Sequence, residues 1–116
     1  MEYICGAYDR LSDADNKVDE SSSIQSQKII IDSFAKFNNL KIYRHYVDDG
    51  YSGGNFDRPA FQEMIKDMKS GKINKIIVYK LDRLTRSIKD LENICTLLEE
   101  YNCSLESVAE EINTST

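Results

Sequence analysis

A serine and four arginines are the residues of this sequence best suited to chemistry, and they occupy three short segments. Arg10 and Ser12 stand two residues apart, Arg58 lies near the middle of the chain, and Arg83 and Arg86 stand three apart. Side chains two apart point to the same side of an extended chain, and side chains three apart share a face of a helical turn. The first and third segments can therefore each present their polar groups together.

This combination suits attack on a phosphodiester. The hydroxyl of Ser12 can act as the nucleophile, and its attack builds negative charge on the non-bridging oxygens of the phosphorus. Guanidinium groups can neutralise that charge without a metal ion, because their fixed donors match phosphate oxygens. A covalent link to the serine also conserves the energy of the broken bond, so that rejoining needs no ATP. The expected site cuts and rejoins a phosphodiester and uses no cofactor.

Two parts of the chemistry stay open. The one histidine, His45, lies inside a predicted strand and is not expected to be catalytic, so an arginine or a water molecule would have to relay protons. Asp48 and Asp49 with Asp82 could instead bind two metal ions, as in a nuclease. We favour a site without metal, because four arginines are expected to face the same crevice.

The segments that must position these residues alternate between strands and helices. Short apolar runs without helical spacing are typical of buried strands in a parallel sheet. The predicted strands are Tyr3 to Tyr8, Lys41 to Val47, Ile73 to Tyr79 and Cys103 to Val108, the last of which could lie at an edge. We expect an α/β three-layer sandwich whose mostly parallel central sheet has about four to five strands, flanked by helices and joined by right-handed crossovers.

Three helices are predicted from apolar residues at helical spacing. The first begins near Ser22 or Ser23, since Ser22 and Gln25 have capping-box spacing, the second begins at Pro59, and the third at about Ser87. They are expected to end before residue 41, at Gly71 and near Tyr101. The residues expected to point inward are Ile30, Ile31, Phe34 and Phe37, then Phe61, Met64, Ile65 and Met68, and then Ile88, Leu91, Ile94, Cys95 and Leu98.

Three segments without a regular pattern each follow a predicted strand. Loops at the carboxyl ends of parallel strands converge on one crevice. We therefore expect Arg10, Arg83 and Arg86 to converge around Ser12 in one anion-binding pocket, with Arg58 nearby or on a loop that closes later. The three segments are residues 9–21, 48–58 and 81–86.

The composition limits the class of protein. A chain of 116 residues with 41% hydrophobic residues has room for one globular domain. No apolar run approaches the roughly 20 residues that cross a bilayer, so we expect no membrane contact and a cytoplasmic location. With 20 acidic and 15 basic residues the net charge is −5, whereas an autonomous DNA-binding domain is usually basic. If DNA is the substrate, the modules that grip it should lie outside this chain.

Four segments resemble the serine recombinase family of resolvases and invertases in their order and spacing. They are YDRLS at residues 8–12, SIQSQ at 23–27, YVDDGYSGGNFDRP at 46–59 and KLDRLTR at 80–86. The form of the third segment, the longer loop before the first helix and the closing SVAEEINTST are similar to the large serine recombinases, meaning phage integrases and transposon excision enzymes. The resemblance covers almost the whole chain and implies a resolvase-like catalytic domain.

The resemblance implies a role for each matching residue. Ser12 would form a 5′-phosphoserine link to DNA and release a 3′-hydroxyl, while arginines bind the phosphate. Two positions depart from the family pattern: Asp9 stands where a small or apolar residue is more usual, and Asn113 replaces an aspartate. The implied catalytic residues are Ser12, Arg10, Arg58, Arg83 and Arg86, and the supporting residues are Tyr8, Gln27, Asp49, Asp82 and Glu110, with no metal site.

The resemblance also implies partners. Residues 1–116 would form the N-terminal catalytic domain, truncated before an oligomerisation helix and DNA-binding domains, which agrees with the acidic charge. The full-length protein would act on double-stranded DNA as a homodimer to tetramer, and the fragment would be a monomer or weak dimer. The main alternative is a catalytically silent regulatory or DNA-associated domain of the same fold. Nucleotide-binding and receiver-like modules share the alternation of strands and helices but lack their own motifs here.

Overall fold

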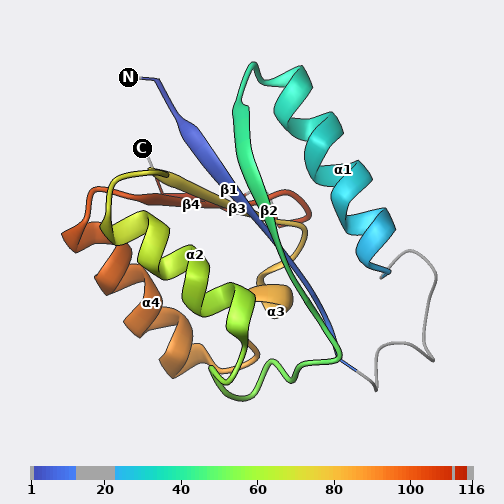
Figure 1. Ribbon diagram of the computed structural model, residues 1–116, viewed down its shortest axis with the longest axis vertical. Coiled ribbons are helices and arrows are strands. Elements are labelled where there is room, and N and C mark those ends of the chain that lie inside the picture. Colours follow the sequence, from blue (N-terminus) through green and yellow to red (C-terminus); the bar gives the residue numbers. More distant parts are fainter. Residues whose placement is uncertain (1, 13–22, 111, 115–116) are drawn as a thin grey trace.

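The computed structural model describes residues 2–12, 23–110 and 112–114, and a five-stranded sheet forms its centre (Figure 1). The strand order is β2-β1-β3-β4-β5, with β1 to β4 parallel and β5 antiparallel to β4. The predicted mostly parallel α/β sheet is therefore confirmed. The strands are β1 (Ile4–Leu11), β2 (Lys41–Asp49), β3 (Lys75–Val78), β4 (Ser104–Ser107) and β5 (Ile112–Asn113).

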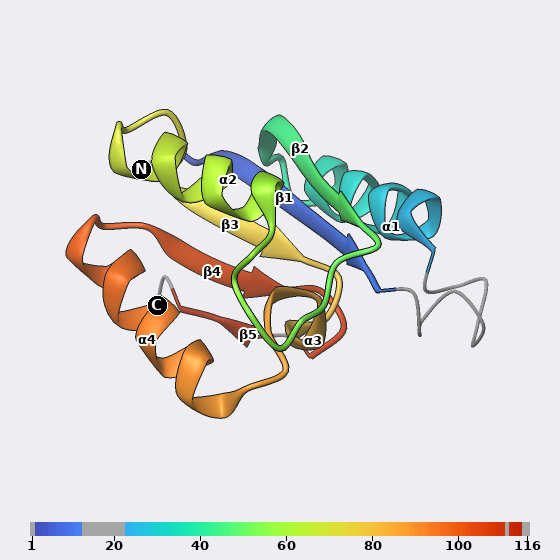
Figure 2. The same cartoon turned by 60° about the horizontal axis from the view of Figure 1, so that its bottom comes forward.

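Helices cover both faces of the sheet and complete the predicted three layers. Helix α1 (Ile24–Phe37) packs on one face against β1 and β2, and α2 (Pro59–Lys69) and α4 (Ile88–Glu100) cover the other (Figures 1 and 2). The one-turn helix α3 (Leu81–Leu84) follows the carboxyl end of β3. None of the helices in the described part of the chain is long and apolar enough to cross a membrane.

Alternation along the strands divides the apolar residues into two cores. The larger core lies under α2 and α4 and contains Tyr8 with Met64 and Leu98, whereas the smaller core lies under α1 and contains Ala7 with Ile31. Successive side chains of a strand point to opposite faces. Neighbouring residues of β1 therefore meet quite different surroundings, and the two faces of this strand carry different polar networks.

The helix starts follow the predicted chemistry. The hydroxyl of Ser23 caps α1 and that of Ser87 caps α4, each by accepting a backbone hydrogen bond, while Pro59 opens α2. Ser22, the expected first residue of a capping box, lies outside the described residues. Gly71 follows α2 with a φ of 84°, a left-handed conformation that favours glycine.

Two residues expected to point inward do not. Phe37 is 89% exposed and Ile88 is 79% exposed. At about 100° per residue, Phe37 is turned roughly 200° from the buried Ala35. On α4, Ile88 is turned roughly 120° from the buried Ile94. Each lies in a terminal turn, where an apolar residue does not have to continue the buried stripe.

The strands run farther than expected, so two of the three expected loops begin later. Pairing continues until Arg10 stands beside Asp48 and Leu11 beside Asp49. The segment after β3, also expected to be irregular, forms α3 instead. Strand β5 was not predicted, because two residues carry no periodic pattern, and it places β4 inside the sheet rather than at its edge.

Candidate active site

The carboxyl ends of β1 and β2 lie side by side and bring the first polar segment into place. The carbonyl of Leu11, the last residue of β1, accepts hydrogen bonds from the N–H groups of Gly50 and Tyr51. Gly50 has a φ of 91°, so a glycine lets the chain turn back toward β1 directly after β2. This turn carries the segment 50–53 across the end of β1.

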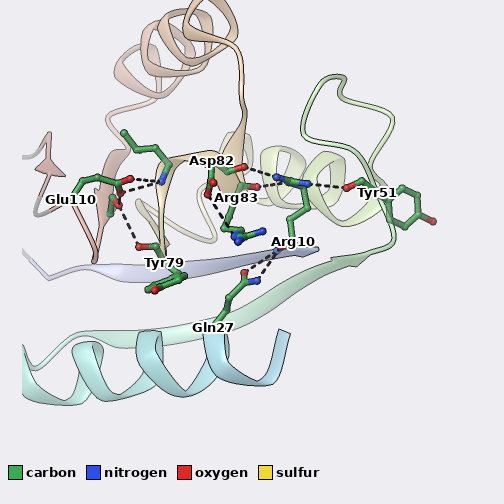
Figure 3. Close-up of polar contacts among 9 residues, drawn as sticks. Arg10, Gln27, Tyr51, Tyr79, Asp82, Arg83 and Glu110 are labelled. Carbon is green, nitrogen blue, oxygen red and sulfur yellow. Dashed lines mark hydrogen bonds and ion pairs between the residues drawn. The ribbon is translucent and has the colours of Figure 1, made fainter. Parts of the chain in front are cut away.

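Arg10 joins three strand-end segments. Its side chain is fully buried, and its guanidinium donates to the carbonyls of Tyr51 at 3.0 Å, of Arg83 at 2.9 Å and of Asp82 (Figure 3). Carbonyl oxygens from α3 and from the segment after β2, which are distant in sequence, thus converge on one cation.

Gly53 allows Arg10 and Arg86 to approach each other. A Cβ atom at Gly53 would lie 2.7 Å from Nη2 of Arg10 and 3.3 Å from Cγ of Arg86, so any larger residue would collide there. The carbonyl of Gly53 also accepts a hydrogen bond from the N–H of Arg86 at 3.2 Å. The segment after β3 is therefore hydrogen-bonded to the segment after β2, at the point where the side chain of Arg10 lies between them. We call Arg10, Arg83 and Arg86 the arginine cluster.

Gln27 of α1 holds the backbone of Arg10. Because β3 pairs with β1 only as far as Tyr8, the backbone groups beyond need other partners. The fully buried side chain of Gln27 supplies both: its Oε1 accepts from the N–H of Arg10 at 3.1 Å, and its Nε2 donates to the carbonyl at 3.0 Å. This contact fixes the strand end from which Ser12, only 9% exposed, follows two residues later.

Arg58 forms a second cationic centre beside the arginine cluster. Its guanidinium carbon lies 4.8 Å from the ring centre of Phe61, 5.2 Å from that of Phe56 and 5.7 Å from that of Tyr8. Its Nη1 donates to the hydroxyl of Tyr8 at 3.2 Å, and its Nε to the carbonyl of Asn55 at 2.9 Å. The side chain is completely buried, and among the described residues Nη2 has no hydrogen-bond partner.

Asp48 organises the surroundings of Arg58. Its carboxylate accepts from the hydroxyl of Tyr8 at 2.7 Å and from the N–H groups of Ala60 and Phe61 at 2.9 Å each. Arg58 occupies the N-cap position of α2 without capping it, so Asp48 takes over that role from the neighbouring strand. Burial and the Asp48 carboxylate raise the pKa of Tyr8 well above its ordinary value, against the opposing effect of Arg58. Tyr8 therefore remains a neutral bridge.

Helix α3 is also capped by an acid from a distant part of the chain. Its N-cap residue, Lys80, makes no side-chain cap, and the N–H of Leu81 donates to the carboxylate of Glu110 at 3.1 Å (Figure 3). Glu110 in turn accepts from the hydroxyl of Ser107, at the end of β4. Glu110 thus holds the turn that carries Arg83 of the arginine cluster.

Tyr8 and Arg10 open two polar networks on the same side of β1: Tyr8 contacts Arg58, and Arg10 meets Arg83 and Arg86. Gln27 reaches the same strand end from α1. Asp82 lies in α3 with its carboxylate 3.6 Å from Nε of Arg83. Asp49 is exposed, and the buried acid of this strand is its neighbour Asp48.

Sequence reasoning missed the roles of Asp48 and Gly53. One signal that Asp48 is buried was its position two residues after the apolar Tyr46. Residues two apart in a strand point to the same face of the sheet, and both of these are buried. A second signal was the absence of a capping side chain before Pro59. Nothing in the sequence indicated that Gly53 meets Arg10, because that contact joins the end of β1 to the distant segment after β2.

A cavity of about 510 Å³ lies at the other end of the sheet. Its walls include Tyr3, before β1, and Cys103 and Ser104 at the start of β4, so it does not adjoin the arginine cluster. In the described part of the chain, no three His, Cys, Asp or Glu side chains are grouped so that they could hold a metal ion.

Residues 5–116 match the family model of the resolvase N-terminal domain. Transposon Tn917 resolvase of Enterococcus faecalis is 31% identical over 96 residues, which make up 83% of this chain and 49% of that protein. Serine recombinase Gin of Escherichia phage Mu is 35% identical over 68 residues, 59% of this chain and 34% of that protein. The chain thus spans between a third and a half of the length of these two relatives.

Two solved structures share the arrangement of strands and helices. The N-terminal catalytic domain of TP901-1 integrase has a TM-score of 0.87 at 30% identity and covers 97% of this chain and 82% of its own. A resolvase family site-specific recombinase from Streptococcus pneumoniae has a TM-score of 0.84 at 30% identity, with coverage of 99% and 78%. Fold, family model and relatives agree, and the chain therefore belongs to the serine recombinase family, in which it matches the resolvase N-terminal catalytic domain.

Proposed function

We propose that this domain breaks and rejoins double-stranded DNA in site-specific recombination, with Ser12 as the nucleophile. The observation that carries the proposal is the meeting of three arginine residues at the carboxyl end of β1: the carbonyl of Arg83 holds the Arg10 guanidinium, and a Cβ atom at Gly53 would touch both Arg10 and Arg86. Ser12 follows Arg10 by two residues. Cations carried by neighbouring residues favour an anion beside them. A phosphodiester is an anion on which a serine hydroxyl can act, and the names of the resolvase and integrase relatives support DNA as its source.

In the proposed reaction, Oγ of Ser12 attacks the phosphorus and gives up its proton. A serine–phosphate bond forms, the bond to the 3′ oxygen breaks, and that oxygen leaves as a hydroxyl after taking a proton. Attack by a 3′-hydroxyl on the phosphoserine reverses these changes and rejoins DNA without ATP. The four guanidiniums, those of Arg58 and of the arginine cluster, stabilise the charge of the five-coordinate phosphorus, and losing one such donor typically costs about 3 to 4 kcal/mol in the barrier.

Arg58 is suited to receive a phosphate oxygen. A buried N–H without a partner costs about 1 to 3 kcal/mol, and its Nη2 is such a group among the described residues. A phosphate oxygen would supply the missing acceptor in a charge-assisted hydrogen bond. In this proposal Tyr8 holds Arg58 in place, and the acids Asp49 and Asp82 offset the repulsion between cations before DNA arrives.

The acidic charge of this chain and the greater length of its relatives suggest that further segments are needed for activity. We propose that the segments that grip DNA and join subunits lie outside residues 1–116, so that oligomers act on DNA in the longer protein. The 116-residue chain, with a net charge of −5, should then bind DNA weakly and fail to recombine it. Gel-shift titration at moderate salt tests this, and tight sequence-specific binding by the chain alone would contradict it.

The nucleophile is tested by Ser12→Ala in a chain that continues beyond Thr116 into the oligomerising and DNA-binding segments. The substitution should abolish strand cleavage and the covalent protein–DNA adduct on denaturing gels, while DNA binding persists. Ser33→Ala, an exposed serine on α1, is the matched control and should cleave normally. Cleavage by the Ser12→Ala protein would assign the nucleophile elsewhere, and a wild type that binds DNA without ever cutting it would favour a silent regulatory domain.

A further inference from the structure

His45 lies between two carboxylates on the α1 face of the sheet. Its Nδ1 is 2.7 Å from Oδ2 of Asp9, and its Nε2 is 2.7 Å from Oδ1 of Asp32. His45 belongs to β2, Asp9 to β1 and Asp32 to α1, so one imidazole links three elements. The side chain of Asp9 is fully buried and that of His45 is 17% exposed, so the inner contact is shielded from water.

This geometry favours the charged form of the ring. A neutral imidazole has one N–H and donates from one nitrogen only, whereas an imidazolium donates from both. Burial works to lower the pKa of His45, but the hydrogen bonds to Asp9 and Asp32 outweigh burial and raise it. Burial raises the pKa of Asp9, against the effects of His45 and of Lys28 on α1.

Both shifts have the same sign for stability. Raised pKa values mean that the folded chain binds protons at Asp9 and His45 more firmly than the unfolded chain does. The stabilisation from His45 is therefore fully present below its ordinary pKa of about 6.5 and is lost as the pH rises through the raised value. Above that value, two carboxylates face a ring that can satisfy only one of them.

The same helix also holds the backbone of the site. Asp9 and Arg10 are consecutive residues of β1, and α1 reaches both of them: it contacts Asp9 through His45 and Arg10 through Gln27. A change in how α1 sits on β1 and β2 would therefore be felt at the Arg10 backbone. This backbone leads directly to Ser12.

We propose that His45, held between Asp9 and Asp32, is a positioning residue that keeps α1 docked, so that Gln27 fixes the strand end carrying Ser12. The inference rests on the proposed function for its effect on cleavage, but the docking itself can be measured without DNA. His45 makes the placement of a serine nucleophile depend on pH from the opposite face of the sheet. It takes no part in the proton transfers.

The first test measures amide hydrogen exchange of Arg10 in the 116-residue chain, corrected for the intrinsic pH dependence, together with the NMR titration of the single histidine. Protection of the Arg10 amide relative to that of Ile77 in β3 should fall roughly two- to fivefold as His45 loses its proton, the size expected for a partly exposed charge pair. Asp32→Asn should lower the pKa of His45 and weaken this dependence. Glu92→Gln, which removes an exposed charge from α4, should behave like the wild type.

The second test compares the pH profile of cleavage in a longer chain carrying Asp32→Asn or Glu92→Gln. The wild type and Glu92→Gln should lose activity over the interval in which His45 titrates, and Asp32→Asn should show a flatter profile. An Arg10 amide whose relative protection stays constant through the titration would overturn the positioning role. If Ser12→Ala still cleaves while the Arg10 amide responds to pH, the proposed function fails and the positioning role stands.

Discussion

The two faces of β1 carry opposite kinds of polar network. On the α2 face, Tyr8 and Arg10 lead to guanidiniums held by carbonyl oxygens and aromatic rings. On the α1 face, Asp9 leads to a histidine and a second carboxylate. Although Asp9 and Arg10 are adjacent in sequence, the two side chains point to opposite faces, so they do not pair with each other.

This separation teaches how one strand can serve two purposes. Carbonyl oxygens hold Arg10 without cancelling its charge, so the cation remains suited to an anion. The imidazole of His45 instead depends on protonation. We therefore expect substitutions on the α2 face to act through packing and hydrogen bonds at any pH, and substitutions on the α1 face to act mainly by changing the pH dependence.

The largest effect is expected from Arg10→Met. The change leaves the carbonyls of Tyr51, Asp82 and Arg83 without the donor they share, and at about 1 to 3 kcal/mol for each buried group the loss should be about 3 kcal/mol or more. Urea unfolding measures it, and the histidine NMR signals should stay unchanged. Arg44→Met, which removes an exposed arginine from β2, should cost less than about 1 kcal/mol. Equal losses in the two variants would mean that Arg10 does not tie the loops.

The next largest effect is expected from Gly53→Ala. The new Cβ would lie 2.9 Å from Cζ of Arg10, and overpacking of this kind costs about 1 to 3 kcal/mol. Gly54→Ala is the matched control, because the nearest atom to its Cβ would be the movable hydroxyl of Ser52 at 3.3 Å, and its cost should stay within about 0.5 kcal/mol. Thermal unfolding measures the stability of the two variants. Equal stability would contradict a close approach at Gly53.

Asp48→Asn should have an intermediate effect. An amide has one acceptor oxygen in place of two, so either an N–H at the start of α2 or the Tyr8 hydroxyl loses its partner, at about 1 to 2 kcal/mol for a lost cap. Asp49→Asn, at the exposed neighbouring position, should change the unfolding free energy by less than about 0.5 kcal/mol. A larger loss at Asp49 would show that the other acid organises this strand end.

The smallest effect is expected from Glu110→Gln. The amide can still accept from the N–H of Leu81, so only the favourable charge at the start of α3 is removed, worth about 0.3 to 1 kcal/mol. Exchange of the Leu81 amide should rise modestly while global stability barely changes. Glu100→Gln, at the end of α4, should leave that amide unaffected, and a similar rise in both variants would remove Glu110 from this role.

The sequence predicted the sheet and the meeting of distant segments, because strand periodicity and the convergence of strand-end loops are general properties of parallel sheets. The supporting role of Asp49 stays a prediction. The caps that Asp48 supplies were not predicted, although Asp48 lies on the same side of β2 as the buried Tyr46. The contacts of His45 with Asp9 and Asp32 were not predicted, because its partners come from β1 and α1 and no local pattern joins them. The prediction that Phe37 and Ile88 point inward was wrong, because residues in the terminal turns of a helix need not continue its buried stripe.

The acid at the start of α3 also bears on how much chain the site needs. Glu110 stands 29 residues after Leu81, so the carboxylate that caps the turn bearing Arg83 comes from far along the chain. Contacts between residues that are distant in sequence require the closure of a long loop, and a domain of this size folds as a unit. A chain that stopped after α4 would therefore contain every residue of the arginine cluster but would lack β4 and the carboxylate that caps α3.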